Sequence, residues 1–391
     1  MGNTKLSGLF LLWLGAAISI AEIVTGTLLA PLGWTMGITA IILGHLIGCV
    51  LFLFPAGYIS ARQSKSAIEV TDTAFGHWGV TLFSLLNAIQ LLGWTAVMIV
   101  NAQIAMNAIS QRLFHFHSPV VMAVIVAALI VLWLVLDHNW LFRVNNLIVI
   151  LLAIGAVILI FTVMTSTYHA HATILSPLGF GAAVELNVTM ALSWLPLIGD
   201  YTQKTQAPVK ASFVSISGYF IGSCVMFLIG LSSVLMTKST DFTTVLAHSS
   251  LGLVALLIIV FSTVTTTFMD AYSAATNIAN ITQVHRIKLL GVIITIIGLI
   301  IALMVSLSAY QSFLYTIGAV FTPLFSIVFT TYFILPHRLP IIVNFGWWLV
   351  GIFLYNHIQQ FNFWCGPTVI TLLSLIIGLV LSYGLYRQLK K

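Results

Sequence analysis

Glu22 and Asp270 are acidic residues that lie well within long apolar segments of the chain. A carboxyl group at such a depth in a membrane is costly unless it faces a cavity or a partner. It can accept a hydrogen bond from an amine, contact a cation or carry a proton. The structural alternative is a neutral acid that is hydrogen-bonded to a neighbouring helix. We favour the interpretation that both residues line a pathway.

Polar and aromatic residues follow one side of the apolar segment 80–108. They are separated by steps of three, four, four and three residues, a spacing that places them on one helical face: Asn87, Gln90, Trp94, Met98 and Asn101. Trp94 alone would be an ordinary packing residue. With polar groups on both sides of it, Trp94 is predicted to form an aromatic platform in a cavity wall, against which a flat ring can stack.

A second polar stripe follows the segment 250–279. Its members recur every three or four residues: Ser262, Thr266, Asp270, Ser273 and Asn277. An isolated Ser or Thr in a membrane helix usually bonds to the carbonyl one turn back. A whole stripe with a carboxylate is harder to explain in that way. Hydroxyl and carbonyl oxygens are also the ligands that a small hard cation prefers.

Two apolar segments contain residues that predict a break in the helix. Gly15, Ser19 and Gly26 punctuate the first segment, and Pro196 removes a backbone donor from the sixth. Carbonyl groups freed at membrane depth are tolerated where they line a cavity. The two segments are five apart in order, which is typical of a five-helix unit that is repeated with inverted topology.

The composition places these segments in a membrane. Of 391 residues 6% are charged and 60% are hydrophobic, too much apolar surface for a soluble protein to bury. A span needs about 20 mainly apolar residues. We therefore predict one all-α transmembrane domain, residues 1–391, with twelve spans: 7–29, 34–59, 80–108, 119–136, 144–166, 180–200, 211–236, 250–279, 288–306, 310–334, 340–357 and 366–387.

The distribution of Lys and Arg predicts the orientation. With the N-terminus inside, twelve of the 14 basic residues lie on the inner side, and Arg112 and Lys238 lie outside. Both termini are therefore expected in the cytoplasm, and the short loops favour a bacterial inner membrane. Because the basic residues are scattered, no nucleic-acid partner is expected. No obligate protein partner is evident beside the lipid bilayer.

Motifs for other classes of function are missing from the sequence. It contains no nucleotide-binding P-loop, no HExxH and no clustered Cys/His metal set, so we expect no cofactor and no metal beyond a coupling sodium ion. An integral membrane enzyme with Glu22 and Asp270 as an acid–base pair is a remote alternative. A scaffolding protein is an equally remote alternative, because polar stripes inside the bilayer would then destabilise the protein without serving a function.

Several segments resemble the nucleobase:cation symporter-1 family. They are Trp13-Leu14-Gly15-Ala16-Ala17-Ile18-Ser19, Gly26-Thr27-Leu28-Leu29-Ala30-Pro31-Leu32-Gly33, Gly93-Trp94, Trp194-Leu195-Pro196 with Asp200-Tyr201-Thr202, and Val264-Thr265-Thr266-Thr267-Phe268-Met269-Asp270-Ala271-Tyr272. The resemblance spans nearly the whole chain. Within the family the chain is most similar to the hydroxymethylpyrimidine permeases, which are relatives of the cytosine permeases.

The resemblance implies a five-plus-five inverted-repeat core with broken helices 1 and 6. The first repeat would be 1–166 and the second 180–334, with two extra helices in 340–391. It implies a substrate site between spans 1, 3, 6 and 8, with Trp94 stacked on the heterocycle. It also implies a sodium-type site formed by carbonyls near Ala16 and Ser19 and by hydroxyls of span 8: Ser262, Thr265 and Thr266.

Two departures from the family pattern affect the substrate. Gly199-Asp200-Tyr201-Thr202-Gln203 lacks the Pro and Arg that many relatives carry, and Phe268, Met269 and Asp270 replace the Asn-rich residues of cytosine-type members. A ring other than cytosine is therefore expected.

The resulting hypothesis is cation-coupled uptake of a pyrimidine, hydroxymethylpyrimidine in particular. The expected substrate contacts are stacking on the indoles and hydrogen bonds to the polar side chains: Glu22, Asn87, Gln90, Trp94, Met98, Trp194 and Asp270. The alternatives are another nucleobase (cytosine, a purine or an allantoin-like ring) and an amino acid or amine. The coupling ion, sodium or proton, stays open at this point.

Overall fold

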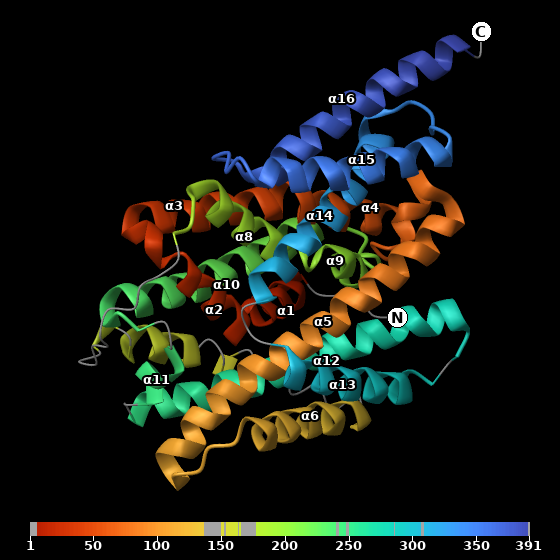
Figure 1. The fold of residues 1–391 in the computed structure, drawn as a ribbon. Coiled ribbons are helices and arrows are strands. Elements are labelled where there is room, and N and C mark those ends of the chain that lie inside the picture. Colours follow the sequence, from red (N-terminus) through yellow and green to blue (C-terminus); the bar gives the residue numbers. More distant parts are fainter. Residues whose placement is uncertain are drawn as a thin grey trace.

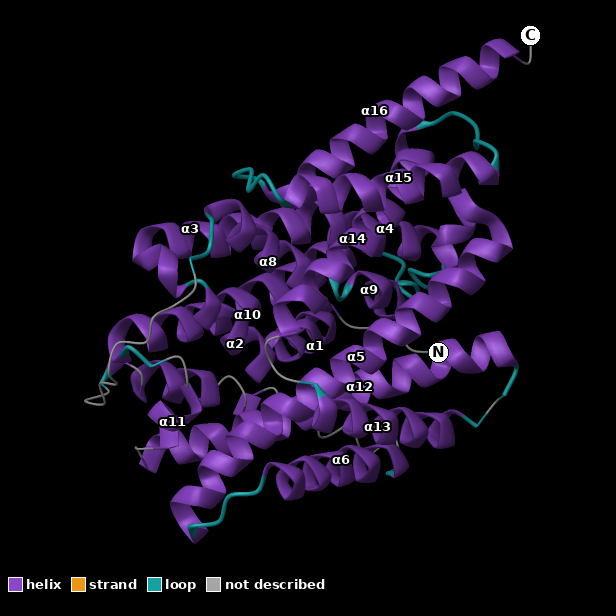
Figure 2. Cartoon of the chain, viewed as in Figure 1, coloured by secondary structure: helices purple, strands orange, loops and turns teal. Residues whose placement is uncertain are grey.

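The computed structural model describes residues 6–136, 150–151, 154–162, 164–165, 177–239, 242–247, 250–284, 286–305 and 309–389. Across these residues the regular secondary structure is helical throughout (Figure 2). Within them, nine helical stretches are long and apolar enough to cross a membrane, and Leu6–Ala17 and Pro119–Val135 are shorter apolar helices. Of the predicted span 144–166, the structure describes 150–151, 154–162 and 164–165, and these residues are helical except for a turn at Thr165.

The first half of the chain has helices in the predicted segments. They are α1 (Leu6–Ala17), α2 (Ile20–Leu28), a short 3-10 helix Ala30–Leu32, α3 (Gly33–Leu46), a π-helix Ile47–Leu53, α4 (Phe54–Gln63), a short 3-10 helix Glu69–Thr71, α5 (Asp72–Phe114) and α6 (Pro119–Val135). Helix α5 bends at Gly76, where φ is 65°. A positive φ is a conformation that glycine adopts without steric cost.

The second half also follows the predicted segments. Its helices are α8 (Phe180–Leu192), α9 (Leu195–Thr202), α10 (Pro208–Thr237), α11 (Phe242–Ala247), α12 (Ser250–Thr282), α13 (Ile287–Met304), α14 (Tyr310–Phe329) continued by a π-helix Thr330–Ile334, α15 (Ile341–Gln359) and α16 (Gly366–Leu389).

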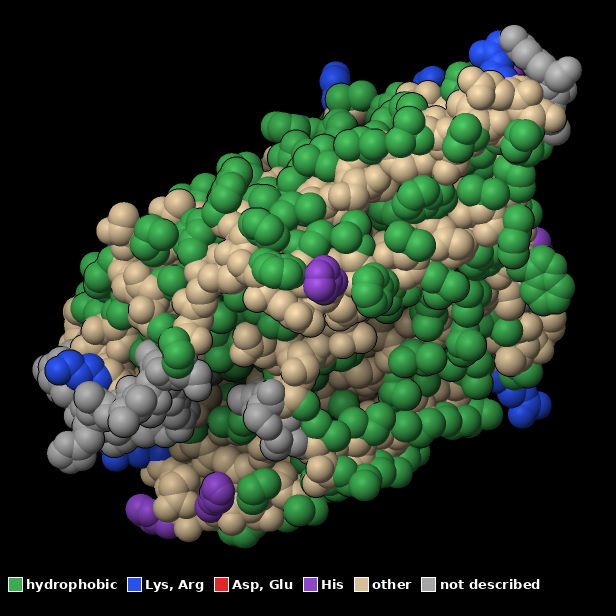
Figure 3. Space-filling model, turned by 45° about the horizontal axis from the view of Figure 1, so that its top comes forward, with side chains coloured by type: hydrophobic (Ala, Val, Ile, Leu, Met, Phe, Trp, Pro, Cys, Tyr) green, Lys and Arg blue, Asp and Glu red, His purple; other side chains and the backbone are tan. Residues whose placement is uncertain are grey.

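The broken helices lie in the middle of the molecule. In Figure 1, α1, α2, α8, α9 and α10 lie between the group α5, α6, α12 and α13 and the pair α15 and α16. Helix α5 packs against α12 and α13, and α14 packs against α8, α15 and α16. Hydrophobic side chains cover most of the face in Figure 3, and Lys and Arg appear near its edges. This is the surface expected of a protein surrounded by lipid.

Helix α2 approaches α10 at backbone distance. A Cβ atom on Gly26 would lie 2.2 Å from the carbonyl oxygen of Phe227, and one on Gly230 would lie 2.0 Å from that of Ile23. Small residues allow such close packing in membranes, where association rests on van der Waals contact. The contact places the first turn of α2, which carries Glu22, directly against the side chains of α10.

Both predicted helix breaks are present in the structure. Between α1 and α2, Ser19 is extended (φ −141°, ψ 161°), and its side chain accepts a hydrogen bond from the Glu22 N–H. Between α8 and α9, Leu197 N–H donates to the carbonyl of Trp194, so the Ser193 carbonyl has no partner within the helix. These breaks turn backbone and side-chain groups toward the centre of the bundle.

Candidate functional site

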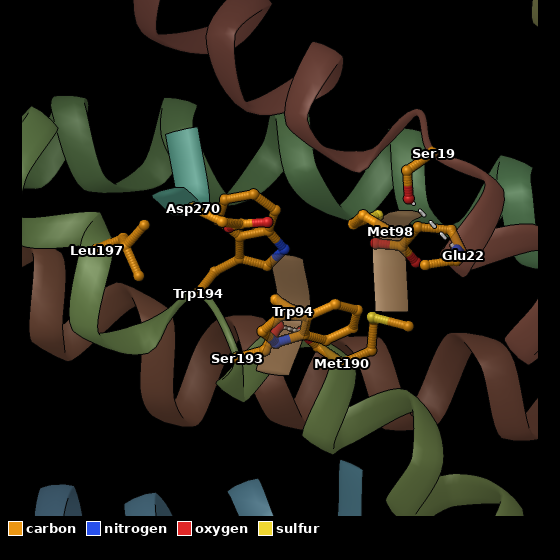
Figure 4. A pocket seen from close by; sticks show the side chains of 10 residues that line it. Ser19, Glu22, Trp94, Met98, Met190, Ser193, Trp194, Leu197 and Asp270 are labelled. Atoms are coloured by element: carbon orange, nitrogen blue, oxygen red, sulfur yellow. Dashed lines mark hydrogen bonds between the residues drawn. The ribbon is translucent and has the colours of Figure 1, made fainter. Parts of the chain in front are cut away.

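A buried cavity lies where the two breaks meet α5 and α12. Ten residues line it: Ser19, Ala21, Glu22, Trp94, Met98, Met190, Ser193, Trp194, Leu197 and Asp270 (Figure 4). The space between their atoms amounts to about 320 Å³, but room for the centre of a water molecule amounts to about 10 Å³. That is about one water. The cavity is therefore too small for a ring, and a ring-shaped ligand requires its side chains to move apart.

Five of the seven predicted substrate residues line this cavity. They come from four elements that are distant in sequence: Glu22, Trp94, Met98, Trp194 and Asp270. Trp94 is 5% exposed, and Asp270 is 4% exposed. Figure 4 shows Trp94 beside Ser193 and Met190, and Asp270 beside Trp194. Two indoles and two carboxyl groups thus share one small apolar space.

The other two predicted substrate residues lie outside this lining, next to the α8–α9 break. The Gln90 side chain donates to the free Ser193 carbonyl over 2.9 Å and to Asn87 Oδ1 over 3.5 Å. Gln90 therefore satisfies a carbonyl that the helix break exposes. Its Oε1 atom is buried and has no protein partner. The structure gives the amide a positioning role at the break.

Neighbouring rings hold both indoles in place. Trp94 makes T-shaped contacts with Tyr310 and Phe313 of α14, with ring centroids 6.0 and 5.5 Å apart. Trp194 makes a T-shaped contact with Trp13 at 5.6 Å. Such edge contacts orient aromatic side chains specifically. The indoles of Trp94 and Trp194 are thus held in position by other side chains of the protein.

Several buried polar atoms around the cavity lack a protein partner. They include Asp270 Oδ2, Gln90 Oε1, Trp13 Nε1 and both side-chain polar atoms of Asn101. An unpaired buried polar group costs about 1–3 kcal/mol, and more if it is charged. Asp270 Oδ2 is the member of this set whose residue lines the cavity. A ligand that donates a hydrogen bond to this oxygen would satisfy it.

The carboxyl group of Glu22, by contrast, is already hydrogen-bonded. Ser223 Oγ donates to Glu22 Oε2 over 2.6 Å, and Tyr219 OH donates to Oε1 over 3.2 Å. Ser223 Oγ also lies 2.5 Å from Nε2 of His45 in α3. Sequence analysis had not selected Ser223 or Tyr219. Their spacing of four residues on α10, which puts a hydroxyl pair on one face, was the available signal.

Of the predicted cation residues, Ser262 of α12 contacts the α1–α2 break, and its partner there is the carbonyl of Ile18 in place of that of Ala16 or Ser19. Ser262 Oγ donates to the Ile18 carbonyl. Ser19 instead caps α2, and Ala16 is buried at the end of α1. Thr265 Oγ1 donates to the Ser262 carbonyl over 2.8 Å.

The remaining hydroxyls of this turn of α12 are buried. Thr266 is 3% exposed. Thr263 Oγ1 is buried without a protein partner. Among the described residues no group of three His, Cys, Asp or Glu side chains is placed to hold a metal ion. The oxygens near Ile18 suit a small hard cation better than a transition metal.

Comparison with protein families gives one match along almost the whole chain. A family model described as permease for cytosine/purines, uracil, thiamine and allantoin matches residues 3–385. No curated protein matches the sequence.

Solved structures with a similar fold include several transporters. The inward-facing conformation of Mhp1 has a TM-score of 0.76 at 14% identity, covering 98% of this chain and 91% of that one. Mhp1 in a closed conformation with bromovinylhydantoin has a TM-score of 0.72 at 17% identity, covering 94% and 90%. A Na⁺-coupled sialic acid symporter has a TM-score of 0.62 at 16% identity, covering 95% and 89%. At these identities the likeness shows a shared fold.

Proposed function

The chain belongs to the family of permeases for cytosine/purines, uracil, thiamine and allantoin, and on that premise we propose that it imports hydroxymethylpyrimidine together with a cation. Import would occur by alternating access, and it would need no cofactor beyond the coupling ion. The protein would lie in the cell inner membrane with both termini in the cytoplasm, because most Lys and Arg residues then face inward.

The small cavity between Trp94, Trp194 and Asp270 is the observation that carries the proposal. An uncharged polar ring loses its hydration on entering, and stacking and paired hydrogen bonds must compensate for the loss. The indoles supply aromatic surface. Asp270 Oδ2, buried and without a protein partner, supplies an acceptor for an exocyclic amine.

One feature favours hydroxymethylpyrimidine over cytosine. Phe268 and Met269 stand where cytosine-type members carry Asn-rich residues. A site with fewer amide groups makes fewer hydrogen bonds to the polar atoms of the ring, so recognition depends more on stacking and on Asp270. The family description names thiamine, of which this pyrimidine is a precursor, beside cytosine and is compatible with either ring.

The shared fold supports the coupling part of the proposal. A similar structure holds bromovinylhydantoin, and another belongs to a symporter described as Na⁺-coupled. Here the Ser262–Ile18 hydrogen bond joins α12 to the α1–α2 break, beside the substrate cavity. A change at this joint would alter the packing of the broken helix and so bias the open and closed states. Breaks in helices one and six fit the proposed five-plus-five repeat.

Competition binding to the purified protein tests the proposed substrate. Tritiated hydroxymethylpyrimidine is bound in detergent and competed with cytosine, uracil, allantoin and leucine. We expect saturable binding that unlabelled hydroxymethylpyrimidine displaces at the lowest concentration, with leucine ineffective. Displacement first by cytosine or allantoin would assign another nucleobase. Displacement by leucine, or an absence of saturable binding, would contradict a heterocycle site of this kind.

A further inference from the structure

A buried hydrogen-bonded chain leads from the cavity to a histidine on another helix. Glu22 on α2, Ser223 on α10 and His45 on α3 follow one another at 2.6 and 2.5 Å. We propose that these three residues form a relay that holds one exchangeable proton, and that this proton is the coupling ion. The second part rests on the transport function proposed above.

The backbone fixes which nitrogen of His45 can take part. His45 Nδ1 lies 2.8 Å from the carbonyl oxygen of Ile41. A carbonyl can only accept, so Nδ1 carries a hydrogen in every state of the ring. The nitrogen that gains or loses a proton is therefore Nε2, which faces Ser223 Oγ.

Counting hydrogens on the Ser223 hydroxyl shows that the relay holds one shared proton. The hydroxyl has one hydrogen, and both Glu22 Oε2 and His45 Nε2 lie within hydrogen-bond distance of it, so one of these two must donate to it while it donates to the other. In one arrangement Glu22 is a neutral acid and His45 a neutral imidazole. In the other, Glu22 is a carboxylate and His45 an imidazolium. The two differ by one proton passed through the serine, and their total charge is the same.

The surroundings favour keeping that proton. Glu22 is 2% exposed and His45 is not exposed. In the described part of the chain no Lys or Arg side chain is buried, so no fixed cation replaces the proton. Without it, a buried carboxylate and a neutral imidazole would compete for one hydroxyl hydrogen, and one hydrogen bond would be lost. An uncompensated buried charge is strongly unfavourable.

The other titratable groups around the relay do not remove this requirement. Tyr219 donates to Glu22, and Tyr310, Cys49 and Cys224 lie near it. Tyrosine and cysteine are neutral at pH 7 when unperturbed. Asp270 lines the same cavity and carries a like charge when ionised. A like charge also disfavours a bare Glu22 carboxylate. The aromatic rings of Phe220 and Phe227 pack on His45 and exclude water from its side of the relay.

The position of Glu22 provides the link to substrate. Its residue lines the cavity, so a substrate amine can donate to the carboxylate form. That contact favours the arrangement in which the proton lies on His45, sealed from the cavity. Substrate also displaces water from the cavity, and a relay without the proton would then bury an uncompensated negative charge beside it. Substrate therefore binds better to the relay that holds the proton, and by linkage the proton binds better when substrate is present.

Infrared titration of the purified protein tests the relay without any substrate. Bands are assigned with Glu22→Gln and His45→Gln. In the wild type, the Glu22 carboxyl band and the His45 ring bands should change in one shared step as pH is raised. In Ser223→Ala, they should change in two separate steps. Ser233→Ala is the matched control, because Ser233 is buried on the same helix with no side-chain partner. Equal titrations in wild type and Ser223→Ala would overturn the relay.

Uptake into sodium-free proteoliposomes tests the coupling. A proton gradient should accumulate labelled hydroxymethylpyrimidine about tenfold per pH unit in the wild type and in Ser233→Ala. Ser223→Ala should lose this accumulation but retain exchange of labelled for unlabelled substrate. Equal accumulation in both variants, or a strict need for sodium, would overturn proton coupling. An absence of uptake and exchange in every form would contradict the proposed function instead, and the infrared titration would still decide the relay.

Discussion

Replacing Asp270 should weaken substrate binding without weakening the fold. The residue is 4% exposed, and its Oδ2 atom has no protein partner. A hydrogen bond to a charged group contributes about 1.5–3 kcal/mol, and a neutral one about 0.5–1.5 kcal/mol. We therefore expect Asp270→Asn to raise the Kd about 5- to 12-fold. Asp270→Leu, which cannot accept a hydrogen bond, should raise it about 10- to 150-fold, since about 1.4 kcal/mol is tenfold.

Glu185 provides the matched control for a buried carboxyl group. It accepts from Tyr355 OH at 2.6 Å and from Thr368 Oγ1 at 2.5 Å, which ties α8 to α15 and α16. Glu185→Gln should therefore lower the melting temperature and leave the Kd unchanged. Asp270→Asn should raise the Kd and leave the melting temperature unchanged, because it removes an acid that no protein group satisfies.

The assay is equilibrium binding of tritiated hydroxymethylpyrimidine, with the melting temperature of each purified variant measured in parallel. Unchanged affinity in Asp270→Leu would refute the role of the unpaired oxygen. A large fall in the melting temperature of Asp270→Asn would show instead that the acid stabilises the fold. Weaker binding in Glu185→Gln would show that buried acids act on the cavity from a distance.

Three further changes test the surrounding structure. Trp94→Ala should weaken binding by about 1–3 kcal/mol, the range for stacking of a base on an aromatic side chain, in the same binding assay. Gly230→Ala should abolish the folded, monodisperse protein in size-exclusion chromatography, because a Cβ would lie 2.0 Å from a carbonyl oxygen; Gly8→Ala, with nothing within 4 Å, should be tolerated. Gln90→Leu should leave the Ser193 carbonyl unpaired and lower the melting temperature by the equivalent of about 1–3 kcal/mol, whereas an unchanged value would place the amide outside the helix break.

Much of the helix arrangement follows from local rules that a sequence carries. Apolar length predicts the membrane segments, and the helical period predicts that Trp94 and Met98 share a face. Pro196 predicts the second break, because proline has no backbone N–H to donate and its ring clashes with the preceding turn of a helix. The first break depends on Ser19, whose side chain can cap a helix or leave its carbonyl free. The structure shows the cap, and the carbonyl that meets α12 is that of Ile18.

Contacts between helices are harder to predict because they depend on register. Gln90 lies on the predicted face, yet it sits close enough to the α8–α9 break to bond the Ser193 carbonyl. The link between His45 and Ser223 joins residues that are 178 positions apart. It depends on how closely α10 approaches α2 and α3, which the small residues along α10 permit but do not specify.

Uptake by proteoliposomes tests the central claim most directly. The purified chain is reconstituted, and entry of labelled hydroxymethylpyrimidine is followed against protein-free liposomes and against liposomes that contain Asp270→Leu. We predict saturable uptake by the wild type that excess unlabelled hydroxymethylpyrimidine blocks and that Asp270→Leu reduces strongly. Uptake by the folded wild type no greater than that of protein-free liposomes would contradict the account.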